Sequence, residues 1–239
     1  EMAGEVQIVD IGGESTRPGA DDVPVAEEIE RTCPVIADMR AARIGAPVSI
    51  DTRKAAVARA ALAAGADMVN DVSGLGFDRG MAPLLAETGA PLCLMLSVAT
   101  PATMQDDPRY EDVLLDVYDF LDARIAEAEA AGIDRGRIVI DPGIGFGKTV
   151  AHNLALLARI SLLHGLGCPV QLGASRKRFV GTVGRAQATG ERLPGSLAVA
   201  LAAVGPGVQI VRVHDTAASV QAVRVARAVW GGKQPEGER

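Results

Sequence analysis

The sequence predicts an α/β protein with a parallel sheet, closed as a (β/α)8 barrel whose first strand is missing from this chain. Short apolar runs alternate with longer helical stretches along the whole of its 239 residues, which is the pattern of repeated βα units. No linker or change of composition divides the chain, and barrels of this kind occupy about 250 residues as a single domain. We therefore expect residues 1–239 to form one domain with seven of the eight βα units.

The predicted strands are brief, partly β-branched and mostly apolar on both faces, as the buried strands of a parallel sheet are. They are expected at 6–11, 47–50, 68–70, 91–96, 137–140, 169–172 and 208–213. A barrel needs an eighth strand, and residues 1–5 resemble the end of a helix, so the first strand is expected upstream of Glu1. The alternative is an open sheet of seven units.

The predicted helices lie between these strands and after the last of them. They are expected at 25–42, 54–64, 81–87, 110–131, 151–164, 196–204 and 219–229. Gly65, Gly89 and Gly132 come just after helical segments. Glycine readily adopts the left-handed conformation that commonly ends a helix, so these three positions support the predicted boundaries.

The composition argues against several classes of function. Thirty acidic and 24 basic side chains give a net charge of −6, and only 3% of the residues are aromatic, so a nucleic-acid-binding surface is not expected. No apolar run approaches the roughly 18–20 residues of a membrane span, and a signal peptide is not expected, because no basic region follows Glu1. The cysteines are three, scattered and without metal-ligand spacing, which fits structural thiols in a reducing, cytoplasmic setting.

Polar side chains follow nearly every predicted strand. These clusters lie at 14–17, 51–53, 70–71, 141, 175–177 and 212–215. In a parallel barrel all strands open with their carboxyl ends on one face, where the active site lies. A strand-end Asp can also cap the next helix, but six clusters that include Asn, Lys, Arg and His indicate one shared site.

The chemistry of these residues suits a flat heterocycle that carries an anionic group. Asp51 and Asp141 could accept hydrogen bonds from an amidine-like edge such as that of a 2-amino-4-oxo ring, and Asn70 offers both a donor and an acceptor. The cations suited to a phosphate or diphosphate are Arg176, Lys177, Arg212 and His214. Each cation taken alone could equally be a solvated surface charge, and no nucleophile motif accompanies the set.

A glycine-rich segment, D-P-G-I-G-F-G-K-T at 141–149, has some of the letters of a phosphate-binding P-loop. The P-loop pattern requires Gly where Pro142 stands, and the ending of a dinucleotide fingerprint is also absent. We therefore predict a tight loop that places Asp141 and covers the mouth of the barrel.

Six strings occur together and in order along nearly the whole chain. They are D-I-G-G-E-S-T-R-P-G (10–19), S-I-D-T-R-K (49–54), N-D (70–71), D-P-G-I-G-F-G-K-T (141–149), S-R-K (175–177) and R-V-H-D (212–215). The set closely resembles the dihydropteroate synthases of the pterin-binding enzyme family. The first and fourth strings are long enough to be highly specific, whereas N-D alone would be weak.

The resemblance implies a TIM barrel and a transferase of folate biosynthesis. The family condenses 6-hydroxymethyl-7,8-dihydropterin diphosphate with p-aminobenzoate and releases pyrophosphate, with Mg²⁺ as the metal. It also implies a cytoplasmic homodimer whose partners are small-molecule substrates, with no nucleic acid and no membrane.

The resemblance also implies roles for individual residues. Asp141 and Lys177 are the expected catalytic residues. The residues expected around the pterin diphosphate are Thr16, Asp51, Asn70, Met95, Asp141, Lys177, Arg212 and His214. Those expected around p-aminobenzoate are Arg17, Pro18, Ser175 and Arg176.

Two departures from the family pattern limit this transfer of roles. The family's first strand and its metal-binding Asn lie upstream of Glu1, so no metal ligand can be named in this chain and the Mg²⁺ ligand is expected there. Leu96 stands where the family usually has His. The alternatives are a folate-methyltransferase type of pterin-binding barrel, a catalytically silent pterin-binding paralogue and, more remotely, an unrelated phosphate-binding isomerase.

Overall fold

The structure is a computed structural model that describes residues 7–16, 20–96 and 108–231. Its strands are β1 (Val9–Gly12), β2 (Val48–Asp51), β3 (Met68–Asp71), β4 (Leu92–Met95), β5 (Ile138–Asp141), β6 (Gln171–Leu172) and β7 (Ile210–Val211). All seven predicted strands are confirmed, each within the predicted range or one residue beyond it.

The helices follow the strands as predicted. They are α1 (Val25–Ala41), α2 (Ala55–Ala64), α3 (Met81–Thr88), α4 (Val113–Ala130), α5 (Val150–Ala158), α6 (Arg178–Gly184), α7 (Leu193–Val204) and α8 (Thr216–Gly231). Among the described residues, the 3₁₀ segments η2 (Arg135–Arg137), η3 (Ile160–Leu166) and η4 (Thr189–Arg192) lie between them. None of the helices in the described ranges is long and apolar enough to cross a membrane.

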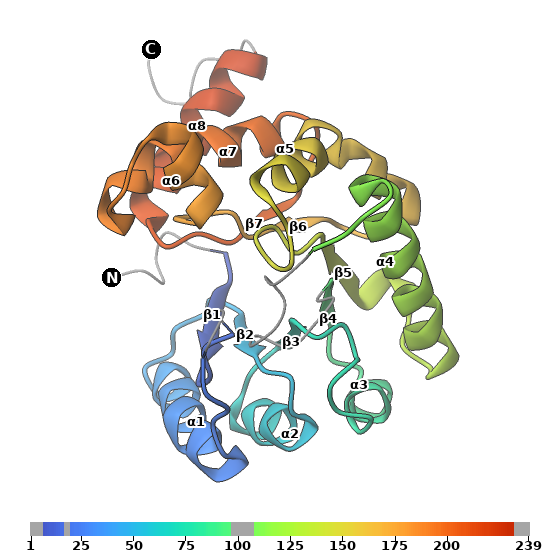
Figure 1. The fold of residues 1–239 in the computed structure, drawn as a ribbon. Coiled ribbons are helices and arrows are strands. Elements are labelled where there is room, and N and C mark those ends of the chain that lie inside the picture. Colours follow the sequence, from blue (N-terminus) through green and yellow to red (C-terminus); the bar gives the residue numbers. More distant parts are fainter. Residues whose placement is uncertain (1–6, 17–19, 97–107, 232–239) are drawn as a thin grey trace.

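The strands are parallel and follow their order in the chain. β1 to β5 form one sheet in the order β1-β2-β3-β4-β5, and β6 pairs with β7 in a second. A bridge between Ile140 and Val170 connects β5 to the segment that enters β6. This sequential order, with the strands curving round inside an outer layer of helices (Figure 1), is that of a barrel and differs from the strand order of a doubly wound sheet.

The prediction of a (β/α)8 barrel is confirmed only in part. Within residues 7–16, 20–96 and 108–231 no ladder joins β7 to β1, so the ring of strands is open at that point. The prediction of one domain over residues 1–239 stays a prediction.

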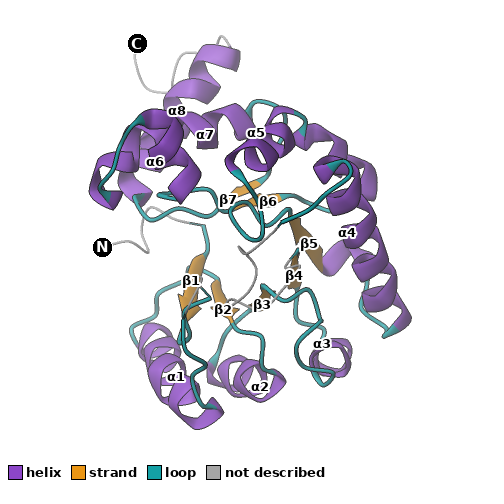
Figure 2. Cartoon of the chain, in the orientation of Figure 1, coloured by secondary structure: helices purple, strands orange, loops and turns teal. Residues whose placement is uncertain are grey.

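The helices lie outside the strands (Figure 2), and the buried side chains of both form the hydrophobic core. Val48 and Ile50 of β2 are fully buried, as are Val57 and Ala61 of α2. Because the strands are covered by helices on their outer face, most of their residues are apolar, and a charged residue within a strand is therefore informative.

The helix predictions were wrong in two places, and three predicted helices (110–131, 196–204 and 219–229) begin three residues away from the observed starts at Val113, Leu193 and Thr216. The predicted helix 151–164 is two segments, because α5 ends at Ala158 and Arg159, with φ −129°, leaves the helical conformation before η3. Helix α6 was missed, since its sequence R-F-V-G-T-V-G has low helix propensity. Burial of Phe179, Val180 and Gly181 stabilises it instead.

The predicted helix-ending glycines are confirmed. Gly65, Gly89 and Gly132 have φ values of 111°, 66° and 97°. These are left-handed conformations that a residue with a Cβ adopts only at a cost.

Candidate active site

Neighbouring strand ends place Asp51, Asn70 and Asp141 on the inner face of the sheet. Asp51 pairs in register with Asn70, and Met95 pairs with Asp141. Paired residues of parallel strands point to the same face, so each pair lies side by side. Asn70, Met95 and Asp141 are each only 4% exposed, and the described residues make no hydrogen bond to the Asn70 side-chain amide. These groups therefore line a buried surface with unused hydrogen-bonding capacity.

Arg212, directly after β7, joins this surface from the other side. Its Nη2 donates to Asp51 Oδ2 at 2.8 Å, and its Nε donates to Asp10 Oδ2 at 2.5 Å. The predicted convergence of Asp51 and Arg212 is confirmed. Asp10 was missed, although a carboxylate inside an otherwise apolar strand is a signal that could have identified it. Its other oxygen, Oδ1, is buried and has no hydrogen-bond partner in the described part of the chain.

The environment shifts the proton affinity of both predicted pterin carboxylates. Burial, together with the negative charge of Asp10, raises the pKa of Asp51 to about 7, although the positive charge of Arg212 opposes this. Burial also raises the pKa of Asp141, against the opposing charge of Lys177. Perturbed carboxylates beside cations are typical of functional sites.

Lys177 lies at the end of the segment that follows β6. Its Nζ donates to the carbonyl of Ile144 and lies 4.3 Å from the centre of the Phe146 ring. Burial lowers the pKa of Lys177 to about 8, while the charge of Asp141 opposes the shift. Lys148, which sequence reasoning did not assign to the site, is also buried, and burial and the charge of Lys177 lower its pKa to about 7.

The glycine-rich segment 142–147 holds Asp141 and Lys177 in place. The amide of Gly143 donates to Asp141 Oδ1 at 2.8 Å, which confirms that this loop fixes Asp141. Lys148 Nζ donates to the carbonyls of Gly143 and Phe146 at 3.0 and 3.1 Å. Asn153 of α5 accepts a hydrogen bond from Gly145 N at 2.7 Å. The loop conformation thus depends on a lysine and an asparagine that do not belong to the predicted site.

The segments 175–177 and 212–215 also meet, as predicted. Ser175 Oγ lies 3.1 Å from His214 Nδ1 and accepts a hydrogen bond from the His214 amide at 3.3 Å. Arg176 has a left-handed φ of 58° and donates from Nε to Asp215 Oδ2 at 2.9 Å. Its amide donates to Ser196 Oγ at 2.9 Å. Both polar clusters are therefore held together by their own side chains.

The remaining predicted residues lie in the segment after β1. Thr16 is half-buried, whereas Arg17 and Pro18 lie outside the described residues. Within the described ranges no group of three His, Cys, Asp or Glu side chains is arranged to hold a metal ion.

Comparison with known proteins identifies the family of this chain. The pterin-binding enzyme family matches residues 2–214. The chain belongs to the pterin-binding enzyme family. This membership confirms the resemblance predicted from the six strings.

Named relatives within the family are dihydropteroate synthases. The chain is 42% identical to dihydropteroate synthase of Escherichia coli strain K12 over 95% of its own length and 79% of the relative. It is 48% identical to a probable bifunctional folylpolyglutamate synthase/dihydropteroate synthase of Haloferax volcanii, of which it covers only 26%. It therefore spans about a quarter of that bifunctional protein and about four-fifths of the shorter one.

Solved structures of a further relative carry ligands. Dihydropteroate synthase of Xanthomonas albilineans with 4-aminobenzoic acid has a TM-score of 0.90 to this structure and 46% identity over 96% of this chain and 81% of that one. The same enzyme has been solved with 7,8-dihydropteroate, with a TM-score of 0.86 and 42% identity over the same shares of the two chains.

Proposed function

We propose that this chain catalyses the condensation of 6-hydroxymethyl-7,8-dihydropterin diphosphate with p-aminobenzoate, giving 7,8-dihydropteroate and pyrophosphate. This is the dihydropteroate synthase reaction of folate biosynthesis, and it makes the chain a transferase. The observation that carries the proposal is the direct contact of Arg212 with Asp51, beside Asn70 on the next strand. A ring-binding group and an anion-binding group from opposite ends of the chain thus share one site.

The pterin ring would lie against the buried strand ends. Asp51, Asn70 and Asp141 provide acceptors and a donor for its amidine-like edge, and Met95 adds an apolar contact. Lys177, held beside Asp141 by the glycine-rich loop, would complete the pocket. Because these groups are fixed before the substrate arrives, little reorganisation is needed when charge develops on the ring.

The diphosphate would bind at Arg212 and His214, with Thr16 as a further contact. In the absence of substrate Arg212 is paired with Asp10 and Asp51. Its side chain is nevertheless 46% exposed, so the diphosphate can reach it. The diphosphate therefore competes with two carboxylates for the guanidinium of Arg212. Binding of the pterin ring to Asp51 would break the ion pair between Asp51 and Arg212.

The reaction needs no protein nucleophile. The bond between the exocyclic methylene carbon and the diphosphate oxygen breaks, with its electrons leaving on pyrophosphate, and the amine nitrogen of p-aminobenzoate forms the new bond to carbon and loses a proton. Cations at the diphosphate stabilise the leaving group, and Asp141 stabilises positive charge on the pterin. Arg17, Pro18, Ser175 and Arg176 would hold p-aminobenzoate.

Mg²⁺ stays a proposal. No step above depends on the ion, and within the described residues there is no group of three His, Cys, Asp or Glu side chains that could hold it. If the ion assists, pyrophosphate release should fall on chelation with EDTA and return when Mg²⁺ is restored in excess.

Three further expectations belong to the same proposal. We infer that the ring of strands is completed as a (β/α)8 barrel by a strand between β7 and β1.

The homodimer is also proposed, and the exposed apolar side chains Val225, Val229 and Trp230 of α8 are candidates for its interface. Sedimentation of wild type and of Val229→Glu would test this, with a monomeric wild type contradicting it. A cytoplasmic location remains a prediction.

The decisive experiment measures pyrophosphate release. The protein is supplied with pterin diphosphate and p-aminobenzoate, and both pyrophosphate and dihydropteroate are quantified. We expect equimolar products that depend on both substrates. Pterin binding without condensation would instead support the silent paralogue, and methyl transfer from a methylated folate would support the methyltransferase alternative.

A further inference from the structure

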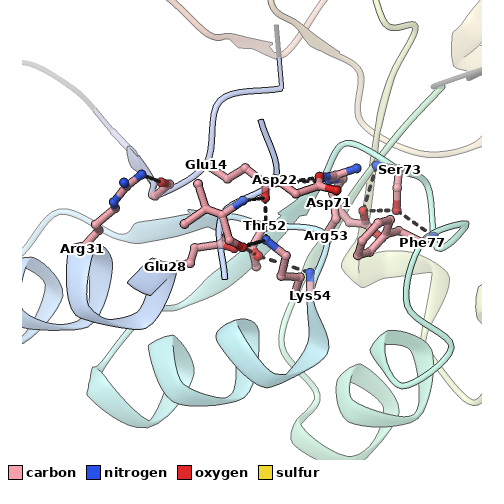
Figure 3. Close-up of polar contacts among 12 residues, drawn as sticks. Glu14, Asp22, Glu28, Arg31, Thr52, Arg53, Lys54, Asp71, Ser73 and Phe77 are labelled. Carbon is pink, nitrogen blue, oxygen red and sulfur yellow. Dashed lines mark hydrogen bonds and ion pairs between the residues drawn. The ribbon is translucent and has the colours of Figure 1, made fainter. Parts of the chain in front are cut away.

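Lys148 differs from Arg53 and Lys54, the buried cations of the β2–α2 turn, in the way its charge is compensated. Arg53 Nε donates to Glu14 Oε1 at 3.1 Å, and Lys54 Nζ donates to Glu14 Oε2 at 2.5 Å (Figure 3). Lys148 is only 4% exposed, yet it forms no ion pair with a carboxylate of the described residues. Burying an ammonium group without a counter-ion is costly, so the contacts that Lys148 does make are informative.

The ammonium group of Lys148 binds the backbone of the glycine-rich segment. Its Nζ donates to the carbonyls of Gly143 and Phe146 at 3.0 and 3.1 Å. The Gly143 carbonyl also accepts a hydrogen bond from the Phe146 amide at 3.0 Å, which closes a tight turn over residues 143–146. Lys148 is therefore bonded to the carbonyls at both ends of this turn, and hydrogen bonds from a charged donor are stronger than those from a neutral one.

The same turn holds two of the side chains proposed to bind the pterin ring. The Gly143 amide donates to Asp141 Oδ1 at 2.8 Å, and the Ile144 carbonyl accepts a hydrogen bond from Lys177 Nζ. The centre of the Phe146 ring lies 4.3 Å from the same Nζ. A shift of the turn would therefore displace the bonding partners of both side chains at once.

We propose that Lys148 is a positioning residue for the pterin ring. It acts by holding the turn 143–146, which orients Asp141 and Lys177. This inference rests on the proposed function, which places the ring against those two side chains. An ammonium group can bind two carbonyls at once, whereas an apolar side chain of the same length binds neither, so the turn is held less firmly when the charge is removed.

The cation proposed for the diphosphate is held by other elements. Arg212 is paired with Asp10 and Asp51, which belong to β1 and β2. We therefore expect loss of the Lys148 ammonium group to weaken binding of the ring and to leave binding of the anion nearly unchanged. A general loss of stability would instead weaken the binding of both.

The test is calorimetric titration with two probes, 6-hydroxymethyl-7,8-dihydropterin for the ring and inorganic pyrophosphate for the anion. Lys148→Met keeps the length of the side chain and loses the ammonium group. It should raise the Kd of dihydropterin about tenfold and change the Kd of pyrophosphate by less than about twofold. Tyr110→Phe is the matched control, because it removes one hydrogen bond to the same segment, from Tyr110 Oη to the carbonyl of Gly147 at 2.8 Å. It should bind both probes as wild type does.

Hydrogen exchange of the ligand-free proteins tests the effect on the turn by itself. The amides of Gly143 and Gly145 donate to Asp141 and Asn153, and both should exchange about tenfold faster in Lys148→Met than in wild type. If Lys148→Met does not fold, Lys148→Gln takes its place in every measurement. Its neutral amide can donate to one carbonyl, so the same changes are expected with smaller size.

Several results would overturn the inference. They are an unchanged Kd of dihydropterin in the folded Lys148 variant, parallel rises in both Kd values, an equal rise in Tyr110→Phe, and amides of the turn that exchange at the wild-type rate. Wild type that binds dihydropterin but releases no pyrophosphate from the two substrates would overturn the proposed function and leave the role of Lys148 in ring binding intact. Wild type that does not bind dihydropterin would overturn both.

Discussion

The pKa values of two buried carboxylates, Glu14 and Asp51, are shifted in opposite directions because their neighbours differ. Burial alone would raise the pKa of Glu14, but hydrogen bonds from Lys54, Val23 and Arg53 hold it below its ordinary value. Asp51 is buried beside Asp10, and one arginine serves both, so its pKa rises to about 7. Glu14 is therefore suited to a fixed structural charge, and Asp51 to exchanging partners when a substrate binds.

Removing the charged groups nearest the proposed reacting ring should reduce turnover. We expect Asp141→Ala and Lys177→Ala each to lower kcat by more than about tenfold, because one preorganised electrostatic contact is commonly worth about 3–4 kcal/mol of the barrier. Pyrophosphate release by purified variants measures this. Circular dichroism checks that each variant is folded, and a normal rate in a folded variant would contradict the role assigned to that residue.

The loop between β5 and α5 illustrates how one segment can depend on its backbone conformation more than on its side chains. Gly143, Gly145 and Gly147 all have positive φ values, of 66°, 80° and 55°. A Cβ on Gly143 would lie 2.3 Å from the carbonyl oxygen of Leu96, and one on Gly145 would lie 2.8 Å from Lys177 Cδ. The glycines let the loop approach β4 and Lys177 closely enough to orient Asp141.

Gly143→Ala should therefore damage both stability and activity. The left-handed conformation costs a residue with a Cβ about 1–2 kcal/mol, and the clash with Leu96 adds to it, so we expect a loss of about 2–4 kcal/mol in the free energy of unfolding. Urea denaturation measures the loss. Gly190→Ala is the matched control, because nothing lies within 4 Å of the added Cβ. Equal stability of the two variants would show that the close approach is not required.

Four buried ionisable groups lie together at the carboxyl ends of the strands, and their burial has a cost in stability. Asp51 and Asp141 are buried there with raised pKa values, and Lys148 and Lys177 with lowered ones. In each case burial disfavours the charged form. Near neutral pH all four groups are therefore held in surroundings that oppose ionisation, as expected of a site built to bind charged substrates.

This arrangement predicts a pH dependence of stability. Between the unfolded pKa of an Asp, about 3.9, and the folded value for Asp51 of about 7, the native state binds more protons than the unfolded state. Stability from this group is thus greatest at low pH and is lost as the pH rises through 7. For Lys148, with a folded pKa of about 7, the native state binds fewer protons above that pH, so stability rises toward pH 10.

Denaturation of wild type and of Asp51→Asn at several pH values isolates the first contribution. Between pH 5 and pH 8 wild type should lose about 1–3 kcal/mol relative to the variant, because only wild type must ionise this buried carboxyl. The comparison with Lys148→Met should show the opposite change: between pH 7 and pH 9 wild type should gain stability relative to this variant. A constant difference between wild type and Asp51→Asn across this range would contradict the raised pKa.

Much of the fold and part of the site could be predicted from local patterns. Hydrophobic periodicity predicts the seven strands and the polar residues that follow them. The conformational preference of glycine predicts where three of the helices end. The order of the strings was enough to predict the family. Helix α6 and the break at Arg159 could not be found in this way, because burial stabilises α6 against its low helix propensity and no residue type announces the break.

The pairings across the site were decided by the tertiary structure. Arg212 and Asp10 are 202 residues apart in the chain, and the contact forms because β1 and β7 are the two ends of one open ring of strands. No spacing rule connects Glu14 with Lys54 either. Residue type and periodicity predict the local secondary structure of each segment. The pKa of a buried charged group depends on neighbours from distant segments, and the curvature of the strands around the ring brings those neighbours together.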